Sequence, residues 1–148
     1  MVNPEMNLDT TCVADLPEKQ KIAFLKAFSK MACLDGNFDE MEKEFIEKMA
    51  VAWGIDSNSV SEIFENLSED EIIKQVSVIE NRRVALELIK EMCVLAHADD
   101  NLSDEEILFI GKVGEAMGVE LEKVEQISNW VIDRLIWLEK GRIIFEEV

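Results

Sequence analysis

The sequence contains few of the residues on which most active sites and extracellular folds depend. Among its 148 residues there are one histidine and no tyrosine, and no glycine-rich loop is present. Neither a nucleophilic triad nor a phosphate-binding loop is therefore indicated. The cysteines, Cys12, Cys33 and Cys93, are odd in number and form no CxxC pair, which argues against a disulfide framework and fits reduced thiols. We therefore expect a non-enzymatic protein.

Basic residues and long apolar runs are also scarce. The chain has 15 Lys and Arg against 32 Asp and Glu, a net charge of −17. Such a charge disfavours nucleic acid and anionic membrane surfaces, and it favours cations or a basic patch on another protein. The most apolar stretch, Trp130 to Leu138, is interrupted by Asp133 and Arg134 and is too short to cross a bilayer. With no signal peptide visible, we expect a cytoplasmic protein that does not insert into membranes.

What the sequence has instead is an internal repeat. Residues 25–56 and 89–120 align without gaps at an offset of 64 positions, and the matches include turn and acidic residues as well as apolar ones. The repeats are predicted over about 16–67 and 82–140 of a single domain, 1–148. The identical pairs are Lys26/Lys90, Asp35/Asp99, Asn37/Asn101, Glu42/Glu106, Phe45/Phe109, Ile46/Ile110, Lys48/Lys112 and Gly54/Gly118.

Helix periodicity and helix-capping patterns cover most of the chain. They predict an all-α, compact bundle of about seven helices, formed by two pseudo-symmetric three-helix units and a connecting helix. Capping boxes are expected at Asp15, Asp39, Ser68 and Ser103, and glycine stops at Gly36, Gly54, Gly118 and Gly141. The predicted helices are 16–34, 39–53, 58–66, 68–80, 82–98, 103–117 and 121–140, and the tail after Gly141 could add an edge strand.

The two turns at 35–42 and 99–106 are rich in acidic side chains. Their carboxylate and amide oxygens suit a hard cation such as Ca²⁺ or Mg²⁺. Neither turn is an EF-hand, because Ile46 and Ile110 occupy the position of the bidentate glutamate. Helix capping alone can explain the other acidic residues, but Asp35 and Asp99 are placed at helix C-termini, where the helix dipole disfavours an anion. That pair is the strongest sequence indication of a cation site.

In layout, residues 32–54 and 96–118 resemble the tellurite-resistance TerB-like family: an Ala-x-x-Asp helix end, a turn, a Ser or Asp cap with Glu three residues later, and a helix ended by Gly. The second copy departs from the family pattern at Asp100, where Gly is expected. The resemblance implies an all-helical, duplicated fold, a stress-response or scaffold role in larger assemblies, and a divalent cation bound through acidic residues. The oxygen ligands of the turns favour Ca²⁺ or Mg²⁺ over Zn²⁺ as that cation. The ligands that the resemblance implies are Asp35, Asp39, Glu42, Asp99, Asp104 and Glu106.

The last predicted helix is apolar nearly all round between Trp130 and Leu138. A surface helix needs one apolar stripe, so this one is expected to be covered on two sides. One interpretation is that the tail or the fourth helix covers the additional face. The other is a homodimer or partner interface through Trp130, Trp137 and Leu138. The alternative function is therefore a protein-interaction module in which the acidic turns only cap helices.

Overall fold

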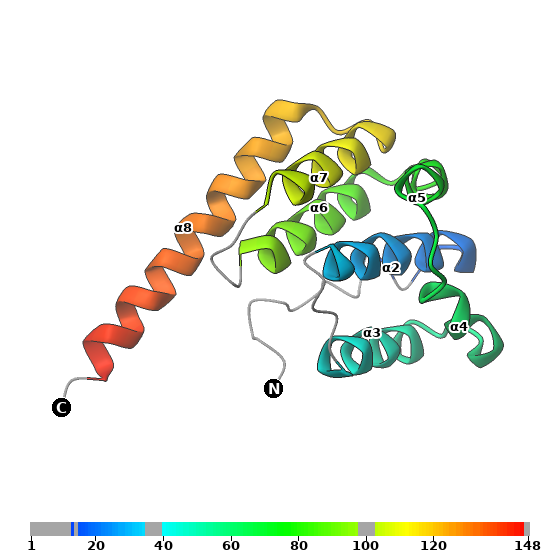
Figure 1. Ribbon diagram of the computed structural model, residues 1–148, viewed down its shortest axis with the longest axis horizontal. Coiled ribbons are helices and arrows are strands. Elements are labelled where there is room, and N and C mark those ends of the chain that lie inside the picture. Colours follow the sequence, from blue (N-terminus) through cyan, green and yellow to red (C-terminus); the bar gives the residue numbers. More distant parts are fainter. Residues whose placement is uncertain (1–12, 14, 35–39, 98–102, 147–148) are drawn as a thin grey trace.

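A computed structural model describes residues 13, 15–34, 40–97 and 103–146. These residues form seven α-helices, one 3₁₀ turn and no strand, which confirms the predicted all-α bundle (Figure 1). The elements are α2 (Glu18–Cys33), α3 (Glu40–Ala52), η2 (Ser57–Ser59), α4 (Val60–Ile63), α5 (Glu69–Val76), α6 (Arg82–His97), α7 (Asp104–Ala116) and α8 (Leu121–Phe145).

Helices α2 and α6 form the centre of the bundle. α2 contacts α3, α4, α5, α6 and, less extensively, α7, whereas α6 contacts α2, α7 and α8. Both helices are buried on more than one face. Their apolar residues are accordingly spread around the helix and are not confined to one stripe. In Figure 1, α3 and α4 lie on one side of α2, and α6, α7 and α8 lie on the other. The largest fully buried side chains of the two central helices are Phe24, Leu25, Phe28 and Met31 of α2 and Leu88, Ile89 and Met92 of α6.

Aromatic contacts attach α3 to α2. The Phe24 and Trp53 rings meet edge to face with centroids 5.4 Å apart, and Phe28 lies 6.2 Å from Phe45. Trp53 follows α3 directly, and its backbone carbonyl accepts a hydrogen bond from Lys21 Nζ at 2.7 Å. These contacts pack α3 along α2 and position the start of α3 beside the end of the first acidic turn.

Several of the predicted helix boundaries are confirmed. Ser103 and Glu106 form a complete capping box at α7, with both hydrogen bonds at 3.1 Å, and Ser68 Oγ accepts from Glu71 N at 3.2 Å. Gly54 and Gly118 have φ angles of 73° and 78°, the left-handed conformation expected of glycine after a helix. The predicted cap at Asp39 and stop at Gly36 lie outside the described residues.

The predicted first capping box is wrong. Helix α2 begins at Glu18 with Pro17 at its N-cap, and no side chain caps it. Proline at this position already fixes φ near the helical value and removes one backbone donor. The helix therefore starts after Asp15 and Leu16, and no backbone N–H of its first turn donates a capping hydrogen bond to the aspartate.

The predicted stop at Gly141 is also wrong. α8 continues through it to Phe145, so the tail is helical as far as that residue, and it forms no strand up to residue 146. A glycine inside a helix costs about 1 kcal/mol relative to alanine, and favourable side-chain pairs next to it offset part of that cost. Arg142 forms ion pairs with Glu139 and Glu146, one on each side of the glycine. Both pairs are exposed to solvent, so each gives the helical last turn only modest support.

Helix α2 packs against α3 and α4 as α6 packs against α7 and α8, but α7 also packs against α8, whereas α3 and α4 are not a principal contact pair. The pseudo-symmetry of the two units stays a prediction. The connecting helix is α5, which ends at Val76 instead of near residue 80, and the predicted helix at 58–66 is reduced to η2 and α4. No helix in the described ranges is long and apolar enough to cross a membrane.

Candidate functional site

Of the six predicted cation ligands, the structure describes three. Asp35, Asp39 and Asp99 lie outside the described residues. Glu42, in α3, and Asp104 and Glu106, in α7, belong to the first turns of their helices. Within the described ranges no group of three or more His, Cys, Asp or Glu side chains is arranged to hold a metal ion. The cation site therefore depends on the acidic turns themselves and stays a prediction.

Glu106 already has a structural role. Its side chain is buried, with 4% of the residue exposed, and its Oε1 accepts a hydrogen bond from the Ser103 backbone. In return, Ser103 Oγ accepts from the Glu106 backbone. One carboxylate oxygen is thus used in capping α7, as the alternative function requires, whereas Asp104 is exposed.

A small polar cluster near the end of α6 was missed by the sequence analysis. His97 Nε2 lies 3.0 Å from Ser128 Oγ of α8, at a pocket of about 120 Å³. Burial lowers the pKa of His97, against the opposing charge of Glu106, so the ring is neutral near pH 7. The same pocket is lined by Cys93, and burial raises the pKa of its thiol to about 12 in spite of a hydrogen bond with Ser128. Cys93 is therefore a protonated thiol, not a thiolate ligand.

A Ser–His contact invites comparison with hydrolases, but the surroundings differ. Ser128 lies in the interior of α8, where backbone N–H groups are used in the helix and cannot point at an oxyanion. The other lining residues include apolar side chains such as Ile107, Ile110 and Val124. The cluster therefore satisfies the polar atoms of His97 and Ser128 where α6 packs against α8.

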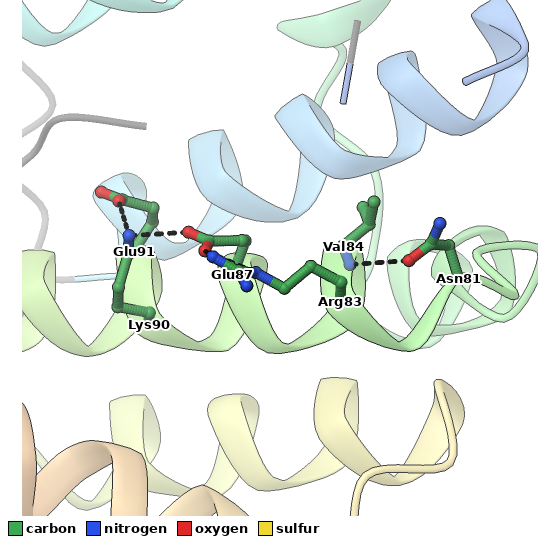
Figure 2. Close-up of polar contacts among 6 residues, drawn as sticks. All are labelled: Asn81, Arg83, Val84, Glu87, Lys90 and Glu91. Carbon is green, nitrogen blue, oxygen red and sulfur yellow. Dashed lines mark hydrogen bonds and ion pairs between the residues drawn. The ribbon is translucent and has the colours of Figure 1, made fainter. Parts of the chain in front are cut away.

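A second feature that the sequence analysis missed is a charged ladder along α6 (Figure 2). Arg83 Nε donates to Glu87 Oε1 at 3.1 Å, and Lys90 Nζ lies 2.6 Å from Glu87 Oε2 and 3.3 Å from Glu91 Oε1. The charges and hydrogen bonds of Glu87 and Glu91 raise the pKa of Lys90, although burial alone would lower it. At the start of α6, Asn81 Oδ1 accepts a hydrogen bond from Val84 N at 3.2 Å.

Glu91 is the most deeply buried member of this ladder. It is 0% exposed, and burial raises its pKa to about 7, a shift that Lys90 opposes. At the offset of 64, Glu87 and Glu91 correspond to Ala23 and Ala27. The ladder is therefore absent from the first repeat. The available signal in the sequence was a pair of glutamates four residues apart, with Arg83 and Lys90 beside them, where the first repeat has alanines.

Of the eleven large apolar residues that are exposed in the described part of the chain, seven lie on α8. Its face toward the bundle contains the buried Val124 and Val131, whereas Trp130 is 53% exposed, Trp137 73% and Ile144 64%. These three exposed residues are seven positions apart, two helical turns, and so share one face. In Figure 1 the C-terminal part of α8 extends away from the other helices.

Neither of the two segments expected to cover this surface does so within the described residues. The tail continues α8 as far as Phe145, and α5 packs mainly against α2 and α7. The interpretation of this surface as a homodimer or partner interface stays a prediction. Leu138, the third predicted interface residue, is partly buried and so less exposed than Trp130 and Trp137.

Comparisons with known proteins assign no relative: no family model matches the chain, and no curated protein or solved structure matches it. The resemblance to the TerB-like family thus depends on residues 32–54 and 96–118 alone, and it stays a hypothesis.

Proposed function

We propose that the protein is a non-enzymatic interaction module, and that its binding surface is the exposed side of α8. The observation that supports this most is the stripe formed by Trp130, Trp137 and Ile144, each at least half exposed. Large apolar patches are uncommon on monomeric proteins and mark interaction sites, and tryptophan is enriched among the residues that dominate binding energy.

The charge distribution supports the same surface. The distal α8 segment, defined as residues 130–146, contains three acidic and three basic residues. It therefore carries none of the net charge of −17. A protein partner approaching this segment meets little of the electrostatic repulsion that the rest of the chain exerts on an acidic surface.

Site-specific photo-cross-linking in the cell tests this proposal. A photoreactive amino acid replaces Trp137 in one variant and Val51 in the control, since both positions are 73% exposed and apolar. We expect a discrete adduct from position 137, identified by mass spectrometry and lost when Trp130 is changed to Ala in the same chain. Equal adduct patterns from positions 137 and 51 would show that the α8 surface is no binding site.

The second candidate is a cytoplasmic, TerB-like module that binds a divalent cation, Ca²⁺ or Mg²⁺, at the acidic turns in a stress-response or scaffold role. What favours it is the pair Asp35 and Asp99, equivalent in the repeat and placed by the sequence pattern where a helix dipole opposes an anion. The two candidates use different surfaces, and each can be tested without the other.

A further inference from the structure

The exposed side of α8 carries two charged residues among its apolar ones. At about 100° of rotation per residue, Asp133 and Lys140 lie between two apolar rows of the helix surface. One row is formed by Trp130, Trp137 and Ile144, and the other by Ile136 and Ile143. All seven residues are exposed, and together they form what we call the distal face: Trp130, Asp133, Ile136, Trp137, Lys140, Ile143 and Ile144.

The two charged residues of the distal face have no partner within their own chain. Arg142 pairs with Glu139 and Glu146 on another side of α8. Among the described residues, by contrast, neither Asp133 nor Lys140 has a salt-bridge partner. The residues three and four positions away from each of them are uncharged, so no ion pair along the helix is open to them. Both charges are therefore available to another chain.

The distal face is complementary to itself when two copies run antiparallel. In a two-fold symmetric pair, a contact of one residue with a second is matched by the reverse contact. A two-fold axis level with the midpoint between Ile136 and Trp137 brings Asp133 opposite Lys140 of the second copy, and Lys140 opposite its Asp133. The same axis brings Ile136 level with Trp137, and Trp130 level with Ile143, of the second copy. Unlike charges thus meet between apolar rows.

A parallel pair lacks this match. In a parallel pair in register, Asp133 and Lys140 would each face the same residue of the second copy, and like charges would meet inside an apolar interface. Antiparallel helices also keep the two bundles apart, because the C-terminal part of α8 extends away from the other helices (Figure 1). The bundles, which carry the net charge of −17, then lie at opposite ends of the paired helices.

We propose that the protein forms an antiparallel homodimer through the distal face, with two reciprocal contacts between Asp133 and Lys140. The inference depends on the proposed function and names its partner as a second copy of the chain. The paired segment is about 22 Å long at about 1.5 Å per residue. Because so short a segment buries less area than most permanent dimers, the dimer should form reversibly as the concentration rises.

Sedimentation equilibrium on the full chain, at about 1 μM to 1 mM protein, tests the pairing. We expect the mass to rise toward twice the 16.9 kDa of one chain. Asp133→Lys and Lys140→Asp each bring like charges together at both contacts and should raise the dissociation constant about tenfold. Glu47→Lys and Lys48→Asp, the matched changes at exposed positions of α3, are the controls and should leave the dimer intact.

The double variant Asp133→Lys/Lys140→Asp tests the orientation. In an antiparallel pair the exchanged charges again face their opposites, so the dissociation constant should return close to that of the wild type. The two single changes alter the net charge in opposite directions, so a general charge effect would move their dissociation constants in opposite directions. A double variant as weak as the single variants would show that the two residues do not face each other.

Circular dichroism checks that each variant is folded, and a second measurement uses the wild type. A carbodiimide joins lysine to a contacting carboxylate, and mixed ¹⁴N and ¹⁵N chains should yield Asp133 and Lys140 linked between different copies. A monomer over the whole concentration range, single variants as tight as the wild type, or no mixed-isotope link would overturn the dimer. If position 137 nevertheless cross-links to a different protein, the proposed function stands and only this partner is wrong.

Discussion

At the scale of residues, burial decides the chemistry of the titratable groups. The pKa of Glu91 is raised from 4.5 to about 7 because its carboxylate is removed from water, although it lies 3.3 Å from Lys90 Nζ. A folded-state pKa above the unfolded value means that the folded chain binds more protons between these limits. The contribution of Glu91 to the free energy of unfolding therefore falls as the pH rises from 4.5 to about 7, and above that pH the contribution stays level.

The variant Glu91→Gln should remove this pH dependence. Relative to the wild type, we expect it to gain on the order of 2 kcal/mol in unfolding free energy between about pH 5 and about pH 8. Urea denaturation at the two pH values measures the difference, and Glu47→Gln, an exposed change on α3, is the control. An equal effect of Glu91→Gln at both pH values would contradict the raised pKa.

At the scale of elements, close helix packing depends on single small residues. In α7, a Cβ added at Gly114 would lie 2.9 Å from Val124 Cγ2 of α8, whereas one added at Gly111 meets nothing within 4 Å. Both glycines are helical, so alanine at either position gains the same helix propensity. The contact with α8 is the difference between the two sites.

Gly114→Ala should therefore destabilise the protein by about 1–3 kcal/mol through overpacking, whereas Gly111→Ala should stabilise it by up to about 1 kcal/mol. Thermal unfolding followed by circular dichroism compares the two variants directly. If both variants shifted the midpoint in the same direction by the same amount, α8 would not pack closely on Gly114.

At the scale of the whole molecule, the net charge of −17 acts on stability in two separable ways. NaCl screens repulsion among all acidic residues and should raise the unfolding midpoint. Ca²⁺ or Mg²⁺ at matched ionic strength should raise it further if the acidic turns bind a cation, because a ligand of the folded state stabilises it by mass action.

The double variant Asp35→Asn/Asp99→Asn should lose this additional increase while keeping the response to NaCl. Calorimetric titration with Ca²⁺, Mg²⁺, Mn²⁺ and Zn²⁺ provides the direct measurement of binding. Identical divalent responses of wild type and double variant would reject these aspartates as the site and leave helix capping as the role of the turns.

The whole fold was partly predictable because its determinants are local. Ser103 with Glu106 and Gly54 with Gly118 mark helix ends through their own backbone hydrogen bonds and φ preferences, and the structure confirms them. Gly141 is not a helix stop: α8 runs through it to Phe145, with exposed ion pairs of Arg142 to Glu139 and Glu146 adding modest support. The Ser128–His97 contact could not be predicted, since it joins residues 31 positions apart across two helices.

The helical class, the internal repeat and the net charge follow from the order and composition of the amino acids, because periodicity and capping are properties of residues close together in the chain. The tertiary structure alone decided which charges are buried, as at Glu91, and which apolar residues are exposed, as at Trp137. Burial depends on what packs against a side chain from elsewhere in the fold. The same apolar residues of α8 would be buried in the core if this part of the chain folded back as α5 does. They are exposed because α8 continues straight.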